Sequence, residues 1–219
     1  NSTVSINNSG HIVSSSHALW AQGQDLSIRN SGALDIVRSG GGYGIYGEAT
    51  FTTAKKAEVD IYNDAAITFS AASAYGVGIW AQASVSTTDY VNNDNHGIAK
   101  VSNYGNIRGE GRAATGIYAN GKDEAEIINR GNIQMDGFGT GLWAESRGKG
   151  LIDNNATVSA SLGIGMSVND GTATLRNSGS ITGKVTDTTA GVLTAHGISI
   201  SARIIDVINS GDVRAGVNV

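Results

Sequence analysis

The chain has 219 residues, with 31 glycines, no proline and no cysteine. Charged residues make up 16% and hydrophobic residues 40% of it, which excludes a disordered tail, a collagen-like chain and a coiled coil. The formal net charge of −4 excludes the basic surface of a protein that binds nucleic acid or anionic lipid. The lack of cysteine excludes disulfides, thiolate catalysis and cysteine-ligated zinc.

A short pattern recurs along the whole chain: an aliphatic residue, an asparagine two places on, a small residue two further and another aliphatic residue two further. Its eight asparagines are Asn8, Asn30, Asn63, Asn103, Asn129, Asn154, Asn177 and Asn209. They lie 22, 33, 40, 26, 25, 23 and 32 residues apart, so the basic unit has 22 to 26 residues and the longer intervals contain insertions. A spacing of two indicates strands, and units this short must stack to bury a core, so the pattern predicts the coils of a parallel β-helix.

The asparagines are expected to form one column, with about 4.8 Å between successive coils. Stacked side-chain amides can hydrogen-bond along such a column, and asparagine also tolerates the left-handed conformation that a sharp corner requires. We assign this column a structural role. The lack of proline agrees with it, because most backbone N–H groups of a β-helix are needed for hydrogen bonds between coils.

A second motif follows in the same coils: a small residue, Ile or Leu, an aromatic residue and another small residue, as in Gly78-Ile79-Trp80-Ala81. Its aliphatic residue faces the core, so the aromatic residue faces outward. The outward aromatic residues on consecutive coils are Trp20, Tyr46, Trp80, Tyr118 and Trp143. Two interpretations stay open. The rings form a binding surface that offers flat faces to sugar rings or a protein partner, or they stack on one another and stabilise one face of the helix.

Insertions are predicted near residues 48–58, 82–97 and 183–194. The first two leave the coil after Tyr46 and Trp80, at one corner, and loops on a rigid scaffold often carry binding residues. The second insertion supplies four further candidate ligand-binding residues, Asp89, Tyr90, Asn93 and His96. The alternative is that these are simple tolerated insertions.

No catalytic residue, metal ligand or cofactor is predicted. The outward column Asp60, Lys100 and Glu126 alternates in sign, which predicts a salt-bridge ladder. Two carboxylates could instead serve as the acid and base of a glycosidase, but the lysine between them favours the ladder. The four histidines are scattered over different coils, and no zinc or calcium motif is complete.

The Ile-x-Asn-x-Gly-x-Ile and Gly-Ile-Trp/Tyr-Ala motifs resemble the passenger domains of bacterial autotransporters, the type V secreted proteins, over essentially the whole chain. The resemblance implies an all-β fold, a right-handed parallel β-helix of about eight coils, with residues 1–219 forming a single segment of a longer passenger. It implies export across the outer membrane, to the cell surface or the medium. The implied function is non-enzymatic and adhesin-like, in adhesion, aggregation, biofilm formation or virulence. Expected partners are a host receptor, a matrix protein or a glycan, or another copy of the chain.

Two alternatives to an adhesin stay open: a polysaccharide-degrading enzyme of the pectate-lyase-like β-helix type, and a pure structural spacer. The serine-protease branch of the autotransporters has a Gly-Asp-Ser-Gly motif, and the nearest string here, Asn177-Ser178-Gly179-Ser180, lacks the aspartate. The chain has neither a long apolar run nor an N-terminal export signal, so we expect no membrane insertion of this segment and an export signal removed upstream. It begins and ends within repeats, so we expect open strand edges that associate end to end.

Overall fold

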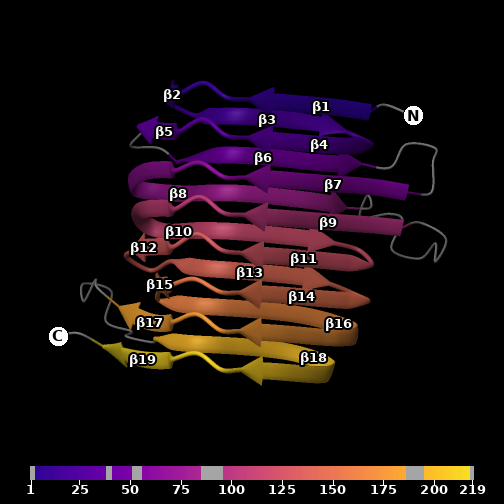
Figure 1. The fold of residues 1–219 in the computed structure, drawn as a ribbon, viewed down its shortest axis with the longest axis vertical. Helices are drawn as coiled ribbons and strands as arrows, with labels where there is room; N and C mark the ends of the chain where they lie inside the picture. Colours follow the sequence, from indigo (N-terminus) through magenta and orange to yellow (C-terminus); the bar gives the residue numbers. More distant parts are fainter. Residues whose placement is uncertain (1–2, 38–40, 51–55, 85–95, 186–194, 218–219) are drawn as a thin grey trace.

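A computed structural model of the chain describes residues 3–37, 41–50, 56–84, 96–185 and 195–217. All regular secondary structure in these ranges is β-strand, and the strands of successive coils pair in parallel. The strands stack along one long axis, with the first and last coils at its opposite ends (Figure 1). The predicted parallel β-helix is confirmed. The described residues contain no helix that could cross a membrane.

Each coil contributes strands to three columns. The first column contains β1 (Thr3–Asn8), β4 (Asp25–Asn30), β7 (Lys56–Asn63), β9 (His96–Asn103), β11 (Glu124–Asn129), β14 (Lys149–Asn154) and the later parts of β16 (Leu162–Asn177) and β18 (His196–Asn209). The second contains β2 (Ile12–Ser14), β5 (Leu34–Val37), the earlier parts of β8 (Ile67–Ser84) and β10 (Ile107–Gly121), β12 (Ile133–Asp136), β15 (Val158–Ala160), β17 (Ile181–Val185) and β19 (Val213–Val217). The third contains β3 (His17–Gly23), β6 (Gly42–Thr50), the later parts of β8 and β10, β13 (Thr140–Ser146) and the earlier parts of β16 and β18.

The core consists of aliphatic side chains that alternate with outward residues along each strand and stack from coil to coil. Ile28, Ile61 and Ile127 are fully buried members of one such stack. In the third column, two successive residues of the second motif face inward, as with Gly44 and Ile45. A Cβ atom at Gly44 would lie 2.5 Å from the backbone oxygen of Gly78 on the next coil, so close coil packing explains the small residue before each aliphatic one.

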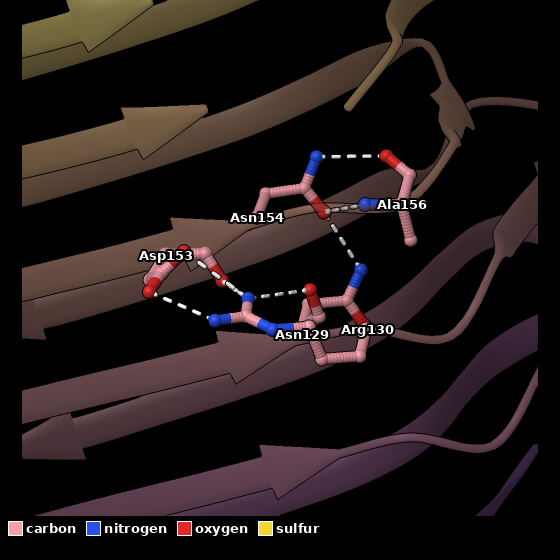
Figure 2. Close-up of polar contacts among 5 residues, drawn as sticks. All are labelled: Asn129, Arg130, Asp153, Asn154 and Ala156. Atoms are coloured by element: carbon pink, nitrogen blue, oxygen red, sulfur yellow. Dashed lines mark hydrogen bonds and ion pairs between the residues drawn. The ribbon is translucent and has the colours of Figure 1, made fainter. Parts of the chain in front are cut away.

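The asparagine column is a continuous hydrogen-bonded ladder. Each Nδ2 donates to Oδ1 of the asparagine on the next coil at 2.7–2.9 Å, in all seven joints from Asn8 to Asn209. The same amide also donates to a backbone oxygen two residues on, as Asn154 does to Ala156 at 2.9 Å (Figure 2). The structural role is confirmed. The expectation of a left-handed conformation at these asparagines is wrong, because no described residue other than glycine has a positive φ.

Regular strand structure extends into the ends of the residue ranges predicted as insertions. Strand β6 continues to Thr50 and β7 begins at Lys56, so both ends of the 48–58 insertion are paired strand. In the same way β8 reaches Ser84, β9 begins at His96 and β17 reaches Val185. The ends of these strands belong to the core, since Ala49, Ala57 and Ala83 are fully buried. The central parts of all three insertions lie outside the described residues.

Candidate functional site

The five outward aromatic residues, which we call the aromatic stripe, lie in register on consecutive coils: Trp20, Tyr46, Trp80, Tyr118 and Trp143. The rings of the first four are nearly parallel. Ring centroids are 4.3 Å apart for Trp20 and Tyr46, 6.3 Å for Tyr46 and Trp80, and 4.1 Å for Trp80 and Tyr118, with interplanar angles of 23°, 15° and 24°. The ring faces therefore contact each other in two pairs, Trp20 with Tyr46 and Trp80 with Tyr118, and these faces are not open to a ligand.

The aromatic stripe ends at Trp143, where glycine replaces an aromatic residue on the next coil. A Cβ atom at Gly165 would lie 2.2 Å from Cε3 of Trp143, so the indole rests directly on the glycine backbone. At the other end Trp20 is 45% exposed, the most open ring of the stripe, whereas the other four are half-buried. A ligand would therefore meet Trp20 and the ring edges of its neighbours.

Two further rings, those of Tyr43 and His17, lie beside the stripe at its Trp20 end. Tyr43 lies edge-on to Tyr46, with centroids 5.0 Å apart, and edge-on to Trp80 at 5.9 Å. His17 lies 4.6 Å from Trp20 and 5.1 Å from Tyr43. Sequence reasoning missed this pair. The sequence nevertheless contained a signal for it, because each of the two residues stands three places before an aromatic residue of the stripe. The small residue and the aliphatic residue lie between the two rings in each coil.

A polar stripe runs beside the aromatic one, formed by the residues two places after each aromatic: Gln22, Glu48, Gln82, Asn120 and Glu145. Its side chains hydrogen-bond to the aromatic hydroxyl and indole groups. The hydroxyl of Tyr46 donates to Glu48 at 2.9 Å, and Nε1 of Trp80 donates to Gln82 at 3.0 Å. The hydroxyl of Tyr118 likewise donates to Glu145 on the next coil, at 3.0 Å.

These contacts fix the ionisation of the stripe. Burial, followed by the hydrogen bond to Glu48, raises the pKa of Tyr46 well above its usual range, and burial raises the pKa of Tyr43. Both hydroxyls are protonated at neutral pH, and the hydroxyl of Tyr46 donates to Glu48. The two stripes together present apolar ring edges, with carboxylate and amide groups repeating once per coil. Sequence reasoning did not single out the polar stripe, although its period-2 spacing from the aromatic residues was visible.

The other predicted binding residues are not brought to the stripes by any described contact. Asp89, Tyr90 and Asn93 lie outside the described residues. His96 begins β9, in the first column, with Nδ1 3.4 Å from Oδ2 of Asp123. That same carboxylate oxygen accepts the backbone N–H of Gly97 at 2.6 Å, so the pair fastens the start of one coil to the corner of the next.

The predicted ladder of Asp60, Lys100 and Glu126 is confirmed in register but not in ion pairing. The three residues oppose one another on successive first-column strands. Asp60 makes a long pair with Arg29, at 4.0 Å, and in the described part of the chain neither Lys100 nor Glu126 has an ion pair within 4.0 Å. The backbone register places the three side chains on one column, but their charged ends do not approach one another within ion-pair distance.

A second group of polar and aromatic side chains lies next to the asparagine ladder. Tyr62 and Tyr104 contact each other with ring centroids 5.4 Å apart, and Arg29 lies 5.7 Å over the ring of Tyr62. Farther along, Arg130 donates from Nη2 to Oδ2 of Asp153 at 2.9 Å, next to the Asn129 and Asn154 amides (Figure 2). These contacts join neighbouring coils. Among the residues that the structure describes, no group of three or more His, Asp or Glu side chains could hold a metal ion.

The fold and its three-column coil define a parallel β-helix domain. Residues 1–216 match the family described as the BigA third pectate lyase-like domain. The match spans nearly the whole chain, so the chain belongs to this family. No curated protein and no solved structure matches it.

Proposed function

We propose that the chain is a non-enzymatic, adhesin-like β-helix domain, exported and displayed at a bacterial surface, which binds a host receptor, matrix protein or glycan through its two stripes. One observation carries the proposal: a rigid shaft bears an outward row of stacked rings, in register over consecutive coils, with a polar row beside it. Proteins use outward tryptophan and tyrosine for recognition because each ring combines apolar area with a polar handle.

The shape of the shaft supports display. Every coil repeats the same register, so contacts made by one coil are offered again by the next, about 4.8 Å farther along. A long ligand could therefore contact several coils at once, and many copies on one cell would add avidity to a weak single contact. The resemblance to autotransporter passengers supports export and surface display, and membership of a β-helix family is compatible with it.

The binding test compares variants with matched exposure. Trp20 in the aromatic stripe is 45% exposed, and Tyr104 on the other edge is 48% exposed. We expect the purified chain to bind a member of an immobilised panel of glycans and matrix proteins, Trp20→Ala with Trp80→Ala to lose that binding, and Tyr104→Ala to keep it. Equal loss in both variants would contradict the stripe as the site. Binding by neither the native chain nor the variants would favour the structural spacer.

The description of the family as pectate lyase-like favours one second candidate, a polysaccharide-degrading enzyme. Its acid and base would be Asp60 and Glu126, which lie two coils apart on the first column, with Lys100 between them. The test is turnover of soluble polysaccharides by the purified chain. Cleavage that Asp60→Ala or Glu126→Ala abolishes, while Lys100→Ala or Trp20→Ala leaves it, would replace the adhesin by the enzyme. Surface display is tested separately, by antibody labelling of intact cells that express the full-length parent protein.

A further inference from the structure

Two arginines beside the asparagine ladder differ in what they contact. Arg130 pairs closely with Asp153, and its side chain is 31% exposed. The side chain of Arg29 is 57% exposed, and Asp60 is the only described carboxylate within 4.0 Å of it, with Oδ2 4.0 Å from Nη2. No hydrogen bond joins the Arg29 guanidinium to another residue in the part of the chain that the structure describes. Its N–H groups are therefore available to an anion.

Arg29 lines a cavity of about 200 Å³ at the end of the first column, over three successive coils. The lining consists of two asparagines of the ladder together with Asn7, Ser9, Arg29, Ser31 and Tyr62. Arg29 is the only charged residue among them. Arg29 and Tyr62 belong to coils that have a described coil on either side, and both side chains face outward. They are therefore exposed at the side of the shaft, independently of its ends.

Tyr62 positions the guanidinium group without using its hydrogen-bond donors. Cζ of Arg29 lies 5.7 Å from the ring centroid of Tyr62, which opposes it on the next coil. This distance is within the range of cation–π attraction, which restrains the guanidinium plane and leaves its N–H groups free. The pair therefore presents a fixed fork of donors beside an aromatic ring.

The other polar side chains of the cavity are neutral and suit hydroxyl groups. Within the described chain, neither the amide of Asn7 nor the hydroxyl of Ser9 forms a hydrogen bond, and the hydroxyl of Ser31 makes one long bond, to the backbone oxygen of Asn8 at 3.3 Å. Amide and hydroxyl groups both donate and accept, so they match a sugar, whereas an acidic peptide side chain would engage the arginine alone. The cavity is smaller than the roughly 300 Å³ at which sites for drug-sized ligands begin, so it suits one small unit.

We propose that this cavity binds one acidic sugar unit of a glycan, with Arg29 on its carboxylate or sulfate and the neutral side chains on its hydroxyl groups. A guanidinium fork matches pairs of oxygens on such anions. The Asp60 carboxylate opposes the anion, so binding of a single unit is weak. The site is separate from the aromatic and polar stripes, because these lie on the third column and the cavity lies at the end of the first. It can therefore bind a glycan whether or not the stripes bind a ligand.

Binding of single sugars to the purified chain, measured by NMR titration, tests the ligand class. The probes are methyl glucuronide, which has a carboxylate, a sulfated glucose, and the neutral methyl glucoside. We expect at least one acidic sugar to bind about tenfold more tightly than the neutral one, and added salt to weaken it. A glutamate blocked at both backbone ends should bind more weakly than that sugar. Equal binding of the neutral sugar, tighter binding of the glutamate, or no binding of either acidic sugar would overturn the proposal.

Two arginine variants test the place of binding. Arg176 is exposed in the same outward column as Arg29, but it is flanked there by Asp153 and Ile208 and by no tyrosine. Arg29→Ala should weaken binding of the acidic sugar about tenfold, whereas Arg176→Ala, which removes the same charge, should leave it within about twofold.

Two further variants separate charge from geometry. Arg29→Lys keeps the charge but loses the fork, so its binding should be weaker than that of the native chain. Asp60→Asn removes the opposing carboxylate and should strengthen binding. Unchanged far-UV circular dichroism shows that each variant is folded. Native binding by Arg29→Ala would place the sugar elsewhere, and equal loss in Arg29→Ala and Arg176→Ala would mean a general charge effect; either result would refute the site.

Discussion

Arg130 donates two parallel hydrogen bonds to the carboxylate of Asp153 on the next coil, from Nη1 to Oδ1 at 3.1 Å and from Nη2 to Oδ2 at 2.9 Å. Nη1 also lies within hydrogen-bond distance of two backbone oxygens, those of Asn129 and Asp153, at 3.2 and 3.1 Å. Arg130 therefore contacts both the side chain and the backbone of the next coil, beside the asparagine ladder (Figure 2).

This forked pair is expected to stabilise the shaft measurably. Both side chains are about two-thirds buried, at 31% and 30% exposure, and bidentate pairs are stronger than single contacts. Arg130→Ala should lower the free energy of unfolding by about 1 kcal/mol, and a double-mutant cycle with Asp153→Ala should yield a coupling of similar size. The more exposed pair of Arg147 and Asp170 is the comparison, and its cycle should give a smaller value. Similar coupling energies for the two pairs would contradict the argument.

Removal of an asparagine should cost more in the middle of the ladder than at its end. Asn103 is fully buried, accepts from Asn63 at 2.8 Å and donates to Asn129 at 2.9 Å, so Asn103→Ala removes one buried hydrogen bond from each of these two neighbours. We expect a loss of about 2–4 kcal/mol in the free energy of unfolding. Asn8→Ala affects one neighbour and partly exposed groups, so chemical denaturation should show a loss below about 1 kcal/mol. Equal losses in the two variants would contradict the argument that burial sets the strength of these bonds.

Two buried serines in the core should respond to alanine in opposite directions. The hydroxyl of Ser146 is buried and has no hydrogen-bond partner in the described structure, whereas the hydroxyl of Ser161 donates to the oxygen of Gly137 at 2.7 Å. Ser146→Ala should therefore stabilise the protein by up to about 1 kcal/mol, and Ser161→Ala should destabilise it by about 1 kcal/mol. Thermal melting of both variants beside the native chain checks the signs, and a destabilised Ser146→Ala variant would contradict the assignment.

Asp35 should make stability depend on pH in the acid range. The Thr68 hydroxyl on the next coil, and then His11, whose Nε2 is 2.6 Å from the carboxylate, hold the pKa of Asp35 below its ordinary value of 3.8. A carboxylate with a depressed pKa stabilises the fold above the unfolded-state pKa and loses that effect as pH falls through the folded-state value. The stability advantage of the native chain over Asp35→Asn should therefore be present at about pH 5 and shrink as the pH falls below about 4.

The Thr68→Val variant separates this cause from general acid unfolding. Without the hydroxyl, the pKa of Asp35 should move up towards 3.8, which carboxyl chemical shifts in NMR titrations would record. An unchanged titration of Asp35 in this variant would show that Thr68 is not the main cause.

Much of this structure follows from spacing in the sequence, because a β-helix repeats one register. The period-2 motifs placed all eight asparagines in one column and all five aromatic residues in another. Spacing does not specify side-chain torsions. The face-to-face stacking of Trp80 and Tyr118, and the failure of Lys100 to pair with its neighbours, depend on how side chains rotate about a common column.

The contacts that sequence reasoning missed do not follow the period-2 spacing of the strands. Arg130 follows one asparagine and Asp153 precedes the next, so their contact is diagonal across two coils and has no fixed period. Tyr43 reaches the aromatic stripe across Gly44, where two residues in succession face inward and the simple alternation fails. Such contacts require the backbone geometry of the corners.

The order of the strands along the axis also determines how the molecule would respond to being pulled. The ends of the chain lie at opposite ends of the stack, and the bonds between coils run along the same axis, so tension would open one joint at a time (Figure 1). The 23 residues from Asn154 to Asn177 occupy about 4.8 Å of axis when coiled and could extend to roughly 80 Å when released. A stretched chain would thus gain length in steps while the remaining coils kept their shape, and at a fixed extension the tension along the chain would fall with each step.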